Sequence, residues 1–445
     1  MKPVSDSATT APASARGWWA VGVFAVTAIL SYTDRQILSL LVDPLHHDLG
    51  LTDTQLSIVQ GAAFAVLYSF VGLPLGRLAD ILPRKAMLLA AVALWSAGTL
   101  SCGLAENFWQ LFAARLLVGV GEAGFAPAAV SLIGDAFPAE RRATALGVFF
   151  TGMVIGSGSA IAIGGMLLSL AQGGAFASVA LLASLAPWRV VLVILGASGV
   201  AAAALLATIR DSSNRRFDLT NLARHLAPAD AFRPFHEKLS LLFPLYAAMA
   251  IGSIVDYAIL SWTPAYLSRQ FAMSPAEIGA SLGSIAVIAG LIGTPAAGAL
   301  SDWYTRRFGT ASRVKLAFTI ALLGFLGAPI GLVATSTLAL AAVFAWIFIS
   351  SVLGVIGIAA VLEALPSESR GLATSTIAFC NTIVGLGLGP TLVALATDHL
   401  YGAPSAVGLA ISTVIAPTIL LTCLFFYLAM QRWSRADGNL IWRTA

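Results

Sequence analysis

The sequence predicts an all-α integral membrane protein with twelve helices in two pseudo-symmetric bundles of six. Hydrophobic residues make up 58% of the 445 residues and charged residues 10%, whereas about 25% of an ordinary globular protein is charged. Apolar segments long enough to cross a hydrocarbon core of ~30 Å recur along the chain. Charged loops also recur in the same order in each half. Because so little charge cannot cover a soluble surface of this size, most of the apolar surface must face lipid.

Apolar segments of membrane-spanning length fall into two sets of six, one before residue 211 and one after residue 239. The predicted spans are 18–42, 54–78, 84–104, 108–134, 143–170, 188–210, 240–268, 276–300, 313–334, 337–362, 371–397 and 405–431.

The longest polar stretch, 211–239, is predicted to be a cytoplasmic linker between the two sets. The domains are then a six-helix bundle over 17–210 and another over 240–432, with tails at 1–16 and 433–445. The first sixteen residues are small and polar, with no long apolar core after a basic start. We therefore expect the first helix itself, rather than a cleaved signal peptide, to direct insertion.

Basic residues favour one orientation in the membrane. If both termini and the loops after even-numbered helices share one side, that side holds every Lys and Arg except Arg35, Arg115, Arg189 and Arg269. The positive-inside rule then places both termini in the cytoplasm. It also accounts for the pI of about 9.1 without nucleic acid as a partner. Short loops and the lack of Asn-x-Ser/Thr sites favour a bacterial inner membrane.

Two loops of the first half have counterparts in the second. The second helix is followed by 76–85, GRLADILPRK, and the eighth by 298–307, GALSDWYTRR. The fourth is followed by 135–142, DAFPAERR, and the tenth by 363–370, EALPSESR. Parallel repeats of six helices are a known design of membrane transporters.

The loop pattern Gly-x-Leu-x-Asp-x-x-x-Arg-(Lys/Arg) resembles the signature of the major facilitator superfamily, although position 83 is Pro where the family usually has Gly. The resemblance implies a conformational latch: the glycine would allow close helix approach, and the aspartate would accept from helix N-termini or a neighbouring basic residue. The alternative is that these charges only enforce topology. The latch residues are expected to be Gly76, Asp80, Arg84, Lys85, Glu140, Arg142, Asp302, Arg306, Glu368 and Arg370.

Five charged residues fall within the predicted spans: Asp34, Arg35, Arg115, Glu122 and Asp256. Charged side chains at membrane depth are costly and usually functional. At ~1.5 Å per residue, Asp34 lies roughly 24 Å from the cytoplasmic face and Arg115 roughly 10 Å from the outer face. Arg115 and Glu122 share one helix face because they are seven residues apart. These four residues are expected to form one buried network, serving either as a static ion pair or as a proton switch.

The repeat predicts that the two halves differ in charge. When the two halves are aligned by their matched loops, Asp34 corresponds to Asp256, Arg35 to Tyr257, Arg115 to Val343 and Glu122 to Ser350. The second half therefore keeps one acid and lacks the other charges. We expect a cavity that is charged on the first-half wall and apolar on the second, with Asp256 opposite.

Three segments resemble the spinster branch of the superfamily: Tyr32-Thr-Asp-Arg35, Arg115-Leu-Leu-Val-Gly-Val-Gly-Glu-Ala123 and Trp262-Thr-Pro-Ala-Tyr266. The resemblance implies lysophospholipid or sphingosine-phosphate transport with proton coupling. Proton coupling is then expected to rest on Asp34, Glu122, Arg35 and Arg115. The expected substrate-binding residues are Arg35, Arg115, Asp256, Tyr257, Trp262, Tyr266 and Phe379.

We therefore expect a proton-coupled, alternating-access transporter of an amphiphilic, lipid-like solute, acting as a monomer among membrane lipids. The alternative on the same fold is a carrier of a small organic anion or a drug. A channel or a membrane-embedded enzyme is disfavoured, because the sequence offers no pore-loop motif and no nucleophile–base pair. No cofactor is expected besides the proton, and no metal, since His46, His47 and Asp48 lie in a short outer loop. The pattern G-x-G-x-x-G at 119–124 lies within an apolar helix, where helix packing explains it better than dinucleotide binding.

Overall fold

The computed structural model describes residues 15–78, 82–209, 237–309, 312–365 and 369–441. Within these ranges the chain is helical and contains no strand. In the first half, a short helix α2 (Val42–Leu49) follows the first span, and the second span is built from α3, a π-helical segment η1 and α4. The elements are α1 (Ala15–Leu40), α2, α3 (Asp53–Ser57), η1 (Ile58–Ala62), α4 (Ala63–Leu78), α5 (Arg84–Leu104), α6 (Phe108–Ala136), α7 (Ala139–Gln172) and α8 (Pro187–Ala207).

The second half repeats this order with more interruptions. Its ninth span ends in 3₁₀ turns, and its eleventh contains two π-helical segments. The elements are α11 (Leu239–Phe271), α12 (Pro275–Phe308), α13 (Ser312–Leu323), η3 (Gly324–Leu326), η4 (Ala328–Leu332), α14 (Ser336–Ala364), α15 (Arg370–Cys380), η6 (Asn381–Leu386), α16 (Gly387–Leu395), η7 (Ala396–Tyr401), η8 (Pro404–Ala406) and α17 (Val407–Ile441).

Eleven helical spans in the described ranges are long and apolar enough to cross a membrane. Helix α1 is not among the eleven, because Asp34, Arg35 and neighbouring polar residues interrupt its apolar run. Its length of 26 residues still exceeds the ~20 residues that a span needs. With α1 included, the count agrees with the predicted twelve helices.

Two helices run further than the sequence pattern predicted. Helix α12 continues to Phe308, so the second signature copy, 298–307, forms the last turns of a helix and is not a loop. Helix α17 continues to Ile441, so most of the predicted tail at 433–445 extends the last span. The hydropathy pattern marks only the apolar part of each helix, whereas the helix itself continues beyond it.

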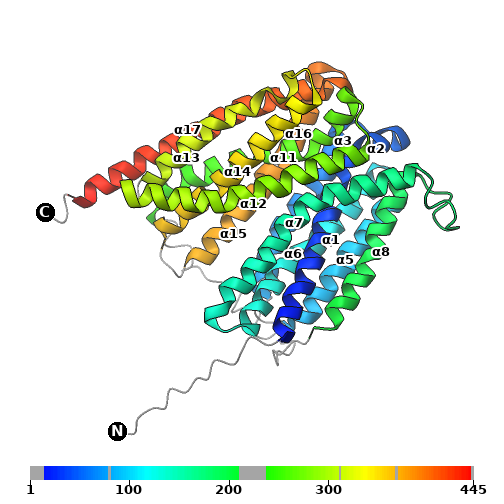
Figure 1. Ribbon diagram of the computed structural model, residues 1–445, viewed down its shortest axis with the longest axis horizontal. Coiled ribbons are helices and arrows are strands. Elements are labelled where there is room, and N and C mark those ends of the chain that lie inside the picture. Colours follow the sequence, from blue (N-terminus) through cyan, green and yellow to red (C-terminus); the bar gives the residue numbers. More distant parts are fainter. Residues whose placement is uncertain (1–14, 79–81, 210–236, 310–311, 366–368, 442–445) are drawn as a thin grey trace, which may run out of the picture.

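The two bundles lie against each other at one end and diverge towards the end where both termini lie (Figure 1). We call these the far end and the terminal end. One hydrophobic core fills the second half and continues into far-end residues of the first half, such as Leu41, Leu56 and Trp188. A separate core, with Phe24, Trp95 and Phe125, fills much of the rest of the first half.

Glycines allow α7 and α12 to pack closely at the contact between the halves. A Cβ on Gly165 would lie 2.1 Å from the carbonyl oxygen of Pro275, and one on Gly158 would lie 2.8 Å from that of Gly283. Gly61 of the second span meets the backbone of Leu386 in the same way. The glycine-rich fifth helix therefore serves helix packing, and the packing joins the two halves.

Candidate functional site

A buried ion pair joins α1 and α6 in the middle of the first half. The Arg35 guanidinium donates from Nε and Nη2 to Oε2 of Glu122 at 3.0 and 2.6 Å. The Glu122 side chain is fully buried and that of Arg35 is 15% exposed. Both nitrogens use the same oxygen, which leaves Oε1 of Glu122 buried without a hydrogen-bond partner. The expected contact between the first and fourth helices is thus present.

Aromatic rings surround the Arg35 guanidinium. Its carbon lies 4.7 Å from the ring centre of Phe64, 4.8 Å from that of Tyr68 and 5.2 Å from that of Tyr32. The Phe64 and Tyr68 rings are stacked with centres 5.1 Å apart. A cation facing aromatic rings is stabilised by their quadrupoles, more strongly where water is excluded. The rings therefore help to hold Arg35 charged at this depth.

Among the described residues, the second arginine of the network, Arg115, forms no ion pair with a carboxylate. It is 2% exposed, and its Nη1 donates only a long bond of 3.4 Å to the backbone carbonyl of Asp34. Its Nε and Nη2 are buried without hydrogen-bond partners, and so is Oδ1 of Asp34. Buried polar groups are nearly always paired in native proteins. The network therefore has free donors and free acceptors, which a bound solute or a transferred proton can engage.

On the opposite half, Asp256 of α11 faces α14. Its Oδ1 accepts from Trp346 Nε1 at 2.9 Å and from Ser350 Oγ at 2.6 Å. Ser350 is the repeat counterpart of Glu122, so the pairing of the first and fourth helices recurs between the seventh and tenth, with a hydroxyl replacing the acid. The predicted difference in charge between the halves is therefore present at these positions.

The other residues expected at the substrate site lie in different surroundings. Tyr257 packs against the core of the first half, and Phe379 contacts Phe70 of the first half edge-to-face at 5.5 Å. Trp262 and Tyr266 are fully buried and donate to the carbonyls of Pro390 and Ile330 at 2.9 and 2.8 Å. Their polar atoms are thus used in holding the second half together, which leaves none for a substrate in this conformation.

Several of the residues expected to form a latch make ion pairs or hydrogen bonds within their own half. Arg84 at the start of α5 pairs with Asp135 at the end of α6, and Lys85 donates to the carbonyl of Ala207 at 2.5 Å. In the second half Arg313 pairs with Glu363, the repeat counterpart of Asp135, at 3.1 Å, and lies 3.9 Å from Asp302.

Other latch residues differ from expectation or lie outside the description. Gly76 does not permit a close helix approach, because a Cβ there would meet nothing within 4 Å. Arg306 is exposed on the last turn of α12. Arg142 donates to the carbonyl of Phe137 at 3.5 Å. Asp80 and Glu368, and the side chains of Glu140 and Arg370, lie outside the described residues.

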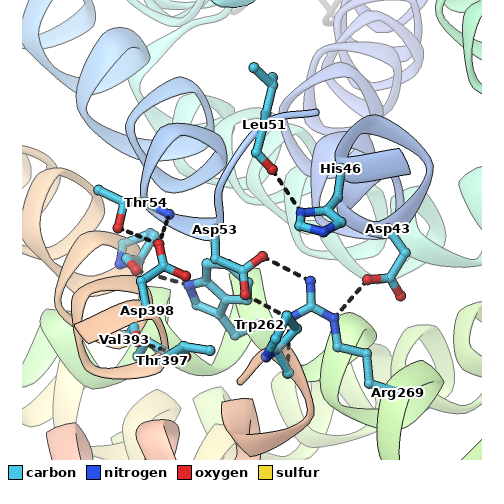
Figure 2. Close-up of polar contacts among 12 residues, drawn as sticks. Asp43, His46, Leu51, Asp53, Thr54, Trp262, Arg269, Val393, Thr397 and Asp398 are labelled. Atoms are coloured by element: carbon cyan, nitrogen blue, oxygen red, sulfur yellow. Dashed lines mark hydrogen bonds and ion pairs between the residues drawn. The ribbon is translucent and has the colours of Figure 1, made fainter. Parts of the chain in front are cut away.

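A cluster of charges that sequence reasoning missed ties the two halves together at the far end (Figure 2). Arg269, in the last turn of α11, donates to both carboxylate oxygens of Asp53 at 2.7 and 2.8 Å, and to Asp43 at 2.7 Å. Arg269 and Asp53 are 9% and 1% exposed. A bidentate arginine–carboxylate pair is among the strongest polar contacts in proteins. We call Asp43, Asp53 and Arg269 the outer latch.

The same cluster contains a helix cap supplied by the other half. Thr52 begins α3 with a capping box to Gln55, which places Asp53 and the backbone N–H of Thr54 at the helix N-terminus. Asp398 of η7 accepts from that N–H at 2.8 Å and from the Thr54 hydroxyl at 2.7 Å (Figure 2). A carboxylate at a helix N-terminus is favoured by the helix dipole, so this contact adds to the outer latch.

One signal in the sequence could have revealed this cluster. Arg269 was one of two arginines that the orientation placed on the outer side, where positive charge is rare. The other, Arg189, lies 3.4 Å from Asp48 within the first half. An isolated outer arginine is thus a reason to look for acids in the outer loops. In the described ranges, no group of three or more His, Cys, Asp or Glu side chains is placed so that it could hold a metal ion.

These features define a membrane transporter with two six-helix halves, tied together at one end and carrying buried charges between helices. The chain belongs to the Major Facilitator Superfamily, whose family model matches residues 24–390, and it is not an enzyme. Within that family it resembles the spinster branch.

Three relatives illustrate the range of similarity. An MFS-type efflux pump of Mycolicibacterium smegmatis is 28% identical over 430 residues, which is 94% of both chains. The sphingosine-1-phosphate transporter SPNS2 of Xenopus tropicalis is 24% identical over 322 residues, 68% of this chain and 59% of that protein. A hexuronate transporter of Bacillus subtilis is 24% identical over 387 residues, 84% of this chain and 86% of that protein.

The fold is shared with a solved structure. The crystal structure of a bacterial homologue of the human lysosomal transporter spinster, in an inward-facing and unoccupied conformation, superposes with a TM-score of 0.79. The match covers 95% of this chain and 98% of that chain at 22% identity. At this identity the likeness establishes the fold alone, so the substrate has to be inferred from the chemistry of the site.

Proposed function

We propose that this transporter moves an amphiphilic, lipid-like solute of the lysophospholipid or sphingoid type, and couples that movement to protons. The observation that carries the proposal is the incomplete pairing of the buried network. Arg115 has two unused nitrogens, and Glu122 and Asp34 each have an unused oxygen. The similarity to a sphingosine-1-phosphate transporter supports the substrate class.

The network supplies the parts of a proton switch. When Glu122 takes up a proton, its ion pair with Arg35 weakens, and the guanidinium can bind a phosphate or carboxylate headgroup through two parallel hydrogen bonds. Arg115 offers a second set of donors close by. The apolar part of the solute is then held by the second half, which carries few charges at the same depth.

Alternating access follows from the way the halves are joined. The outer latch and the α7–α12 contact hold the far end closed. If both termini are cytoplasmic, as the basic residues favour, the end that these contacts close is the outer one. The opposite conformation then requires the outer latch to break and the terminal end to close. Such a chain needs no partner protein and works as a monomer in the membrane.

Uptake into liposomes tests the proton switch. The protein is reconstituted with a labelled lysophospholipid, with and without a pH gradient across the bilayer. In the wild type we expect the gradient to drive accumulation. In Asp34→Asn and Glu122→Gln we expect the gradient to have no effect, while exchange of solute at equal concentrations persists. The control is Asp48→Asn, an acid of the outer loop. Retained proton coupling in both network variants contradicts the switch.

A second candidate is a carrier of a small organic anion or a drug. It is favoured by the hexuronate transporter and the efflux pump among the relatives, and the two buried arginines suit any carboxylate. Thermal stabilisation of the purified protein separates the candidates. Lysolipids are compared with glucuronate and with hydrophobic amine drugs, and the class that raises the unfolding temperature most identifies the substrate.

A further inference from the structure

The second half contains a small cavity beside Asp256. It is lined by residues of α11, α14, η6 and α17, and its volume is about 50 Å³. The polar residues that line it are Ser253, Asp256, Trp346, Ser350 and Asn381. Neither Arg35 nor Glu122 lines this cavity, and the proposed proton switch makes no use of it.

Asp256 lacks a positive partner. Both of its hydrogen bonds, from Trp346 and Ser350, go to Oδ1. Among the residues that the structure describes, no lysine, arginine or histidine forms an ion pair with it. A carboxylate at membrane depth needs a compensating positive charge or a proton. The second carboxylate oxygen is available for either.

Several hydrogen-bond acceptors line the cavity. The Ser350 hydroxyl proton and the Trp346 N–H are used on Asp256. The Ser253 hydroxyl donates to the Ala250 carbonyl at 2.7 Å. Oδ1 of Asn381 is buried with no hydrogen-bond partner. The walls offer an occupant oxygen lone pairs from one carboxylate, one amide and two hydroxyl groups, and the amide NH2 of Asn381 is the remaining polar group of these side chains.

We propose that this cavity binds a sodium ion. Hard cations prefer carboxylate, carbonyl and water oxygens as ligands. One carboxylate is balanced by one positive charge, whereas a divalent ion would leave a net charge buried. The volume holds one small ion with a water, since a single water needs only about 10–15 Å³. The ligands are Asp256, Asn381, Ser253 and Ser350.

Sodium in this cavity would join three spans of the second half. Asp256 lies on α11, Ser350 on α14 and Asn381 on η6, so bound sodium stabilises their packing. Each half of the molecule then holds its own buried cation, a guanidinium beside Glu122 and sodium beside Asp256. This proposal concerns the ion alone, so it stands or falls independently of the substrate.

Direct binding of ²²Na⁺ to the purified, detergent-solubilised full chain tests the proposal. We expect one saturable sodium per wild-type chain, competed by lithium and unaffected by choline. Sodium should also raise the midpoint of thermal unfolding by about 2–4 °C relative to choline chloride at equal ionic strength. Binding should disappear in Asp256→Asn, and its affinity should fall at least fivefold in Asn381→Ala.

Two further variants locate the site. Binding should be retained in Asp34→Asn, the repeat counterpart in the first half, and in Asp48→Asn. If Asp256→Asn does not fold, Asn381→Ala and Ser350→Ala test the site instead, because both keep the carboxylate. Each should bind sodium more weakly than the wild type. The proposal is overturned if no ²²Na⁺ binds and the unfolding temperatures in sodium and choline are equal. It is also overturned if sodium binding is unchanged in Asp256→Asn. The cavity would then hold water, or Asp256 a proton.

Discussion

At the residue scale, the buried charges differ in how fully they are paired. Arg269 is satisfied by two acids, whereas Arg115 has only one long hydrogen bond to a carbonyl. Removing one partner of a buried ion pair typically costs about 3–5 kcal/mol, because the other charge is left uncompensated. Complete pairing suits a contact that holds a conformation. Incomplete pairing suits a site that must exchange partners during transport.

Trp262→Phe tests whether the indole acts in stability or in substrate binding. The substitution keeps the ring but removes the 2.9 Å hydrogen bond to the Pro390 carbonyl, which is worth about 1 kcal/mol. We expect the unfolding midpoint to fall by about 1 °C, with the KM of transport unchanged. A higher KM with an unchanged unfolding midpoint would instead indicate that Trp262 binds the substrate.

The residue scale also shows what sequence could and could not predict. Loop matching placed Asp256 at the counterpart of Asp34 and Ser350 at that of Glu122, and these two are hydrogen-bonded. The depth of the charged residues and the helix face they share predicted a network that includes Arg35 and Glu122, which are in contact. The outer latch escaped, because Asp53 and Arg269 are 216 residues apart and belong to no shared motif. For Trp262, hydropathy did not tell which face of its helix is buried, and the hydrogen bond to Pro390 could not be predicted.

At the element scale, α7 and α12 pack against each other across the contact between the halves. Their glycines allow backbone contact near the far end. Small residues let membrane helices approach closely, since van der Waals packing drives their association. The fifth helix contains Gly152, Gly156, Gly158, Gly164 and Gly165, but the sequence alone does not show whether the helix that packs on them belongs to the same half.

Gly165→Val tests this contact. The added side chain would collide with the carbonyl of Pro275, and overpacking of this kind costs about 1–3 kcal/mol. We expect the closed far end to be disfavoured. Ser39 lines a cavity of about 150 Å³ between the halves beside the outer latch. The test uses Ser39→Cys in a chain lacking the native cysteines. With Gly165→Val, this cysteine should react with a polar maleimide about tenfold faster than it does when Gly165 is unchanged.

The matched control lies on the same helix. A Cβ at Gly147 of α7 would meet nothing within 4 Å, so Gly147→Val should leave the labelling rate of Ser39→Cys unchanged. Equal rates in the Gly165 and Gly147 variants would show that the α7–α12 contact does not control opening.

At the scale of the whole molecule, closure depends on charges that cross between the halves. The hydrophobic core is continuous at the far end, and the outer latch fixes the position in which the two parts meet. Twelve helices and two halves could be predicted from hydropathy and loops. Which end is closed could not, because the same sequence must support both conformations.

Arg269→Ala should shift the molecule towards far-end opening, because Asp43 and Asp53 would be left near each other without a counter-charge. We expect the labelling rate of Ser39→Cys to rise more than tenfold and the rate of solute transport to fall. Exchanging the charges, as Arg269→Asp with Asp53→Arg, should restore slow labelling in part. Asp48→Asn, whose partners lie within the first half, serves as the control. An unchanged rate in Arg269→Ala would mean that the latch does not govern closure.

The outer latch also bears on how the chain is made. Asp53 is synthesised 216 residues before Arg269, and at about 5–20 residues per second roughly 10–40 s separate the two. During that interval Asp53 has no Arg269 to pair with and must stay hydrated at the bilayer surface. Its burial therefore marks a late step, in which the second half docks onto a first half that is already inserted. Biogenesis should thus be most vulnerable between the emergence of the two halves.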